Sequence, residues 1–274
     1  MPELEIFRYD FMARALLAGV IVGLIAPVIG MFLVVKRYSL LADTLSHVSL
    51  VGVALGVLAG FNPVAGAMGT ATIAAVGMER LRTAGRLFSE SILALFLSGS
   101  FAVAVVLLSW SHGLNVDLFA YLFGSITTVS PADLRVIALF GLLVLSLTLW
   151  LFKQLFLVCY DEELARASGL PAARLNLALM LLAATAVAIS MRVIGVLLVG
   201  ALIVIPVTSA MQFGRSFAAT ARLAVLLSLT AVVAGLVASF YLDLPSGGAI
   251  VLVCLLLFAV SLAANRRMAA RRRP

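Results

Sequence analysis

Residues 38–60 read YSLLADTLSHVSLVGVALGVLAG, an apolar run long enough to cross a lipid bilayer. The run carries an acid, Asp43, and an imidazole, His47, four residues apart, so on a helix both side chains project from one face. Ionisable side chains are costly inside a membrane, and where they occur they indicate a pathway or a binding site. This pair is therefore the first candidate for function.

The composition of the whole chain places this run in an integral membrane protein. Of 274 residues, 64% are hydrophobic and only 11% are charged, whereas soluble domains are about a quarter charged. No long polar segment separates the apolar runs, so residues 1–274 are predicted to form one polytopic domain. The net charge of +7 comes from short loops and from a basic tail at 265–274, which argues against nucleic-acid binding.

Nine apolar runs are long enough to be candidate spans, and they predict an all-α transmembrane bundle. They cover residues 11–35, 39–60, 63–79, 90–110, 132–155, 174–191, 193–213, 222–242 and 247–264. Some connections between them are very short, for example the few residues around Arg192, so one run is expected to be a half-span. We therefore expect eight to nine spans, with 11–35 retained as a span rather than cleaved as a signal peptide.

The positions of Lys and Arg predict the orientation of these spans, because cytoplasmic loops carry an excess of both. Nine alternating spans put the basic residues near 36–37, 80–86, 160–174, 215–222 and 266–273 on the cytoplasmic side. Only four of the 19 Lys and Arg residues then lie outside, namely Arg8, Arg14, Arg135 and Arg192. The N-terminus is expected outside and the C-terminus inside.

Small residues and one proline suggest how the spans pack. Gly52, Gly56 and Gly60 recur every four residues, a spacing that lets membrane helices approach closely. Pro206 lies inside an apolar run, where proline frees a carbonyl and kinks the helix. We interpret the glycines as packing residues and Pro206 as a kink or hinge.

The recognisable catalytic motifs are missing from the sequence. It has no phosphate-binding loop of the GxxxxGK[ST] kind, and no GxSxG or HExxH motif. Asp43 and His47 offer an oxygen and a nitrogen, which suit first-row divalent metals, although zinc usually takes about four ligands. A two-fold dimer would supply two of each. The alternative is a buried hydrogen bond that only holds helices together. His112, the other histidine, is expected at the outer surface.

The longest internal cytoplasmic connection, residues 160–174, has features of a docking element. Its charged part favours a short helix, which Gly169 and Pro171 would end. A solvated loop helix is one interpretation, and a contact site for a partner protein is the other.

Four motifs resemble a known family. They are LLADTLSHVSLVGVALG (40–56), VDLFAYLFGSITTVSPADL (116–134), DEELARASGLP (161–171) and RVIGVLLVGALIVIPVTSA (192–210). In this order they resemble the membrane permeases of bacterial ABC importers for zinc, manganese or iron. The first two motifs are most similar to the zinc-uptake permeases of the ZnuB type.

The resemblance implies a homodimeric permease in the inner membrane, with a separate dimer of cytoplasmic ATP-binding cassette subunits and a periplasmic metal-binding protein. The family's metal-pathway residues fall on Asp43 and His47. Its coupling helix falls on about 160–171, where Asp161, Glu162, Ala165 and Gly169 match. Many relatives have a proline where this chain has Glu162, so the first turn of that helix departs from the pattern.

The implied protein transports metal without a permanently bound cofactor, and it is not itself an enzyme. Two other functions remain open from the sequence. A secondary metal/proton antiporter would use the same pair but would not need the 160–171 segment. An intramembrane enzyme with His47 as base would need a nucleophile on another span, and none is evident.

Overall fold

The structure is a computed structural model, and it describes residues 9–85, 88–110, 118–125, 127, 129 and 130–271. Its elements are all helices: α1 (Asp10–Val35), α2 (Ser39–Ala59), α3 (Pro63–Thr83), α4 (Ser89–Trp110), α5 (Leu118–Phe123), α6 (Pro131–Trp150), α7 (Phe152–Tyr160), α8 (Glu162–Ala167), α9 (Ala172–Ile194), α10 (Val199–Met211), α11 (Phe217–Leu242) and α12 (Ser246–Arg271). The prediction of a polytopic helical bundle is confirmed.

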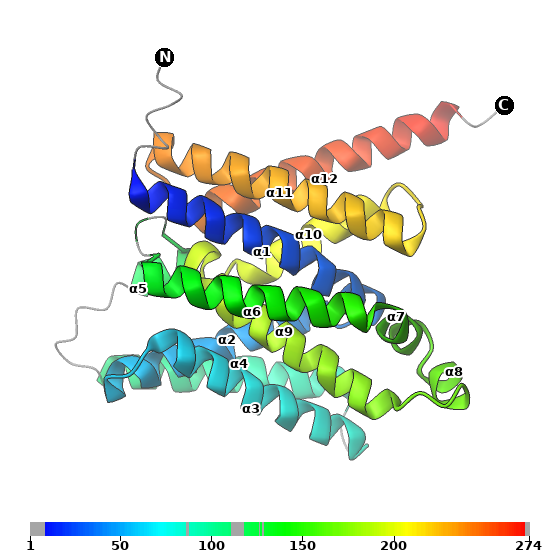
Figure 1. Cartoon of the computed structure of the whole chain (residues 1–274), viewed down its shortest axis with the longest axis horizontal. Helices are drawn as coiled ribbons and strands as arrows, with labels where there is room; N and C mark the ends of the chain where they lie inside the picture. Colours follow the sequence, from blue (N-terminus) through cyan, green and yellow to red (C-terminus); the bar gives the residue numbers. More distant parts are fainter. Residues whose placement is uncertain (1–8, 86–87, 111–117, 126, 128, 272–274) are drawn as a thin grey trace.

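The long helices run roughly side by side along one axis, as Figure 1 shows. The chain enters at one end of the bundle and leaves at the other, and α8 lies at the end where the C-terminus leaves. Helix α1 begins at the first of these ends and α12 ends at the second, so the two termini lie at opposite ends of the long axis.

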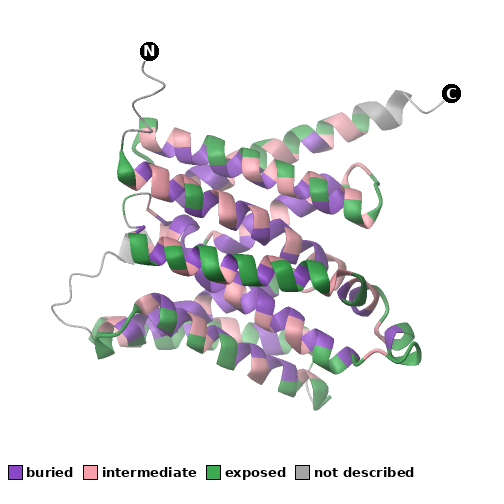
Figure 2. Cartoon of the chain, viewed as in Figure 1, coloured by how far each residue is buried: buried purple, intermediate pink, exposed green. Residues whose placement is uncertain are grey.

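Burial separates an inner group of helices from an outer group. In α9, 72% of the most apolar window is buried within the chain, against 17% in α4 and 28% in α6. Figure 2 shows the buried positions gathered toward the middle of the bundle, while exposed positions line its outer helices. The exposed side chains of α4 and α6 are largely apolar, as lipid or a second subunit requires.

Within the described residues, seven helices have both the length and the apolar composition to cross a membrane. The eight to nine predicted spans differ from this number in two places. Helix α3 has 21 residues and packs along α2, but it carries Glu79 and Arg82 near its end. Helix α10 has only 13 residues, so at 1.5 Å per residue it falls short of the membrane's apolar thickness.

The half-span predicted from the short connections is α10. Its run was expected to begin at residue 193, but α9 continues to Ile194 and α10 begins only at Val199. The backbone between them is non-helical and its amides bond elsewhere: Val196 N donates to Tyr121 O and Leu197 N to Leu122 O in α5. The α5 segment thus satisfies backbone groups that the break exposes.

Three glycines make this junction possible. A Cβ on Gly195 would overlap backbone atoms of Leu122 and Gly124, and a Cβ on Gly247 would overlap Ile194 O. Gly195 and Gly124 also have φ values of 88° and 76°, which disfavour other residues. Ser246 Oγ donates to Val193 O at 2.8 Å, which holds the start of α12 against the end of α9.

Candidate functional site

Helix α2 carries the candidate pair, and the turn before it sets its direction. Arg37 has a φ of 61°, and the Tyr38 amide donates to Leu33 O at 2.7 Å, so α1 and α2 are joined by a tight turn. Asp43 lies in the second turn of α2 and His47 one turn further on, and both are half-buried. The acid is therefore near the α8 end of the bundle.

Asp43 packs against the beginning of the half-span α10. A Cβ on Gly200 would overlap Asp43 Oδ1, so the carboxylate rests directly on the backbone of that glycine. Gly200 is in the first turn of α10, whose N-cap Leu198 makes no side-chain cap. The positive end of a helix dipole and its free amides are favourable surroundings for an anionic oxygen.

His47 projects from the same face of α2 as Asp43, but it packs against α4. Its ring meets Phe101 edge-on, with centroids 5.3 Å apart and the planes at 86°. Its Nδ1 is buried and has no hydrogen-bond partner among the described residues. A buried polar atom without a partner is uncommon, and it is available to a ligand that the chain alone does not supply.

The donors that the structure describes in one chain do not complete a metal shell. Across the described part of the chain, no group of three or more His, Cys, Asp or Glu side chains gathers closely enough to hold an ion. Asp43 and His47 therefore offer at most two ligands from one subunit. His112, the other histidine, lies outside the described residues.

The two glycines of α2 at 52 and 56 and its C-cap Gly60 have different surroundings. Gly52 and Gly66 lie back to back, because a Cβ on either would overlap the carbonyl oxygen of the other. A Cβ on Gly56 would come within 2.8 Å of Pro63 Cα. Gly60 does not pack: a Cβ there meets nothing within 4 Å, and its φ of 72° shows that it caps the helix instead.

Pro206 lies buried inside α10. Two hydroxyls that follow the proline bond to the preceding turn of α10, at carbonyls other than Leu202 O, the one that Pro206 frees. Thr208 Oγ1 donates to Val204 O at 3.1 Å, and Ser209 Oγ donates to Ile205 O at 2.7 Å. The interruption of helical backbone lies at 195–198, upstream of the proline.

Helix α8 and its flanks match the short segment expected at about 160–171. Asp161 is the N-cap and accepts from Leu164 N at 2.9 Å. Gly169, with a φ of 81°, ends the helix, and Leu170 N closes it on Ala165 O at 3.0 Å. Ala165 is fully buried, so it fixes the inner face of α8 against the bundle.

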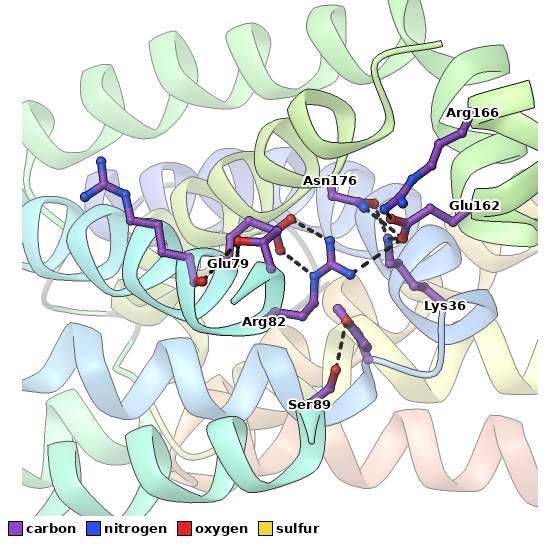
Figure 3. Close-up of polar contacts among 10 residues, drawn as sticks. Lys36, Glu79, Arg82, Ser89, Glu162, Arg166 and Asn176 are labelled. Carbon is purple, nitrogen blue, oxygen red and sulfur yellow. Dashed lines mark hydrogen bonds and ion pairs between the residues drawn. The ribbon is translucent and has the colours of Figure 1, made fainter. Parts of the chain in front are cut away.

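Glu162 joins α8 to three other elements through what we call the Glu162 cluster, made of Lys36, Arg82, Glu162, Arg166 and Asn176 (Figure 3). Its Oε1 accepts from Arg166 at 2.6 Å, and its Oε2 accepts from Asn176 Nδ2 at 3.0 Å. Oε2 also lies 3.6 Å from Arg82 Nη1 and 3.7 Å from Lys36 Nζ. Lys36 Nζ donates in turn to Asn176 Oδ1.

The electrostatics of this cluster favour a charged Glu162. Burial alone would raise the pKa of this carboxyl, but hydrogen bonds from Asn176 and Arg166 and the charges of Arg82 and Lys36 lower it below its ordinary value. At Lys36 burial outweighs the attraction of Glu162 and lowers the pKa. Both pKa values are lowered, which favours the charged form of Glu162 but the neutral form of Lys36, the more enclosed side chain at 10% exposure against 23%. We therefore define the ion pair by its interatomic distance and not by the pKa shifts.

The opposite end of the bundle has its own polar contact. Arg192 lies 3.6 Å from Asp133 Oδ2, and its guanidinium stands over the Tyr121 ring at 5.1 Å. The contact joins α5, α6 and α9 next to the 195–198 break. Sequence reasoning used Arg192 only as a topology marker, and nothing in the spacing of these residues signalled the contact.

Comparison with known proteins matches nearly the whole chain. Residues 8–265 match the family described as ABC 3 transport family. The chain is 29% identical to the high-affinity zinc uptake system membrane protein ZnuB of Haemophilus influenzae, over 95% of this chain and 100% of that protein. It is 30% identical to the manganese transport system membrane protein MntC of Halalkalibacterium halodurans, over 94% and 88%.

A solved structure supports the same grouping. PsaBC from Streptococcus pneumoniae, determined in complex with Fab, superposes with a TM-score of 0.84 at 28% identity, covering 93% of this chain and 92% of that one.

Proposed function

The chain belongs to the ABC 3 transport family, and on that premise we propose that it is the permease of an ATP-driven importer for a divalent transition metal. Zinc is the proposed cargo, and manganese or iron is the alternative. The proposed partners are a second copy of the chain, a dimer of cytoplasmic ATP-binding cassette subunits and a periplasmic metal-binding protein. ATP hydrolysis belongs to the partner subunits, so this chain is not itself an enzyme.

The observation that carries the proposal is the state of the Asp43/His47 pair. His47 has a buried nitrogen without a partner in the described structure, one helical turn from a carboxylate that faces the start of a half-span. Oxygen and imidazole donors suit zinc, manganese and iron. In transporters, substrate sites commonly lie where a discontinuous helix begins inside the membrane.

The donor count favours a homodimer. One subunit supplies two ligands, and a two-fold axis beside α2 would supply two Asp and two His without further residues. His47 lies under Phe101 of α4, a ring that is 46% exposed on the least enclosed span. The outer face of α4 is therefore the proposed side on which a second copy approaches.

The Glu162 cluster is the proposed connection between the ATPase and the Asp43/His47 pair. Helix α8 is the docking element, and its Glu162 contacts Lys36, which lies three residues before α2 begins. A displacement of α8 would move the base of α2 and, with it, Asp43 relative to Gly200. We propose that this motion exposes the ion first to the outer side and then to the cytoplasm.

The orientation follows from the position of α8. If α8 docks on a cytoplasmic ATPase, the C-terminus is cytoplasmic and the N-terminus is periplasmic, because the two termini lie at opposite ends in Figure 1. The excess of Lys and Arg near the α8 end supports this orientation in the inner membrane.

The test is metal uptake by the whole transporter reconstituted with its ATPase and binding protein. Asp43→Asn and His47→Ala are each expected to abolish zinc accumulation while the complex still assembles. Asp243→Asn is the matched control, because it neutralises an exposed acid beyond the end of α11 and keeps a residue that tolerates its φ of 51°. Full uptake by both site variants would refute the site assignment.

The same assay separates the other candidate functions. Zinc and manganese offered in parallel identify the cargo. Uptake that persists without the ATPase, or without ATP, would favour an antiporter. Turnover of a substrate by the purified dimer alone would favour an intramembrane enzyme.

A further inference from the structure

An open groove lies at the α8 end of the bundle, and it shares no residue with the Asp43/His47 pair or the Glu162 cluster. Its volume is about 910 Å³. One wall is the beginning of α11, the other is the junction of α6 and α7, and Val28 of α1 forms part of the floor. The groove opens on the side of the bundle, where the walls carry exposed apolar side chains such as Leu149 and Leu226.

Helix periodicity and small residues create the hollow. The α11 wall consists of residues 218, 221, 222, 225 and 226, which are spaced three, four, seven and eight apart and so share one face. Two of them, Ala218 and Ala221, are too small to reach the opposite wall. The gap therefore follows from the sequence, and larger side chains at these two positions would close it.

The groove is polar at one end and apolar along the rest. Lys153 in α7 and Arg222 in α11 line the part nearest the end of the bundle. Within the described chain, neither cation is in a salt bridge. Val225 and Leu226 follow Arg222 further into α11, and Leu149 precedes Lys153, so both walls become apolar toward the membrane interior.

Trp150 lies where the lining of the groove changes from polar to apolar. It is the last residue of α6, lines the groove and is 77% exposed. Tryptophan is enriched at the boundary between headgroups and acyl chains. The two cations therefore lie at headgroup depth, and the apolar walls lie at acyl-chain depth.

We propose that this groove is a binding site for one anionic phospholipid of the leaflet at the α8 end. The phosphate would lie between Lys153 and Arg222, and an acyl chain would lie along Leu149, Val225 and Leu226. Basic pockets between membrane helices on the cytoplasmic side are suited to such headgroups. The two cations favour an anionic headgroup, and the apolar walls favour a long acyl chain.

Tryptophan fluorescence provides a direct test, because the chain has only two tryptophans, Trp110 and Trp150. In the Trp110→Phe variant, Trp150 alone reports on the groove. The protein is reconstituted into vesicles that contain phosphatidylglycerol or phosphatidylcholine with brominated acyl chains, which quench at short range. We expect half-maximal quenching at a mole fraction of brominated phosphatidylglycerol roughly tenfold lower than of brominated phosphatidylcholine.

Three variants test the cations. Lys153→Gln and Arg222→Gln should each weaken this preference about threefold, and the double variant should abolish it. Arg135→Gln, an exposed cation at the other end of α6, should leave it unchanged. Ala221→Leu should reduce quenching by both lipids, because the added side chain fills the groove.

Two further results would overturn the proposal. Equal quenching by the two lipids, or a preference that survives the double replacement, would show that the cations select no headgroup. Absence of quenching by either lipid would show that protein, such as a second copy, covers the groove.

Discussion

The Asp43/His47 pair and the Glu162 cluster both place ionisable groups in an apolar bundle, yet they differ in how fully those groups are satisfied. Glu162 receives hydrogen bonds or ion pairs from four side chains on the α1–α2 turn, α3, α8 and α9. His47 has a buried nitrogen that the described chain leaves without a partner. A saturated cluster holds elements together, whereas an unsatisfied pair retains capacity for a ligand.

The two regions are also linked by one helix. Lys36 of the cluster leads into α2, and α2 carries both members of the pair. Helix α2 can therefore be perturbed at the Glu162 cluster before its first turn, along the side that packs on α3, or at the Asp43/His47 pair.

The largest effect is expected at Gly200, the residue on which Asp43 rests. In Gly200→Ala the new Cβ would overlap Asp43 Oδ1 and displace the carboxylate, so zinc uptake should fall by up to about 100-fold. Gly69→Ala in α3 is the control, because a Cβ there meets nothing within 4 Å. Normal uptake by Gly200→Ala would separate Asp43 from the pathway.

A smaller effect is expected when the cluster loses its acid. Glu162→Gln removes the acid that Lys36 contacts, whereas Arg82 keeps its closer partner Glu79, so the coupling of ATP hydrolysis to uptake should weaken roughly tenfold, as for loss of about 1.4 kcal/mol. The ratio of zinc transported to ATP hydrolysed measures this directly. Glu163→Gln alters an exposed neighbour and should have no effect; equal losses in both variants would remove the special role of Glu162.

Replacing Gly52, which packs closely on α3, should lower stability more than replacing Gly60, which caps the end of α2. Gly52→Ala forces α2 away from the Gly66 carbonyl and is expected to cost about 1–3 kcal/mol. Gly60→Ala meets no atom and bears only the strain of a positive φ, about 1–2 kcal/mol. The melting temperature in detergent should be lower for Gly52→Ala than for Gly60→Ala, and the reverse order would contradict the packing assignment.

The smallest effect is a pH dependence of the cluster. Because the pKa of Glu162 is lowered in the folded chain, its stabilising contribution is complete above the ordinary value of about 4.3 and is lost as the pH falls through the folded value. The melting temperature of the wild type should therefore fall more steeply below about pH 4.3 than that of Glu162→Gln. Parallel curves for the two proteins would show that Glu162 contributes nothing.

The sequence predicts the helical bundle well, because apolar runs and loop charges follow directly from the membrane's demands. It also places Asp43 and His47 on one helix face and predicts a short helix ended by Gly169. These features are local, since each depends on residues within a few turns of one another. Long-range contacts were not accessible in this way.

The Glu162 cluster illustrates that limit. Lys36 and Arg82 were interpreted only as topology markers, and their contact with Glu162 depends on how α1, α3 and α8 pack. Gly60 was grouped with Gly52 and Gly56 by spacing alone, but it sits where α2 ends and takes a cap conformation instead. The break at 195–198 likewise depends on α5 and α12, which supply the partners for its backbone.

The central claim is that His47 and Asp43 of two subunits bind the transported ion. Because the chain has two histidines, zinc X-ray absorption of the purified dimer without a histidine tag can identify the imidazole. We predict imidazole scattering around zinc in the wild type and in His112→Ala, and its loss in His47→Ala. Imidazole scattering that persists in His47→Ala would contradict the account.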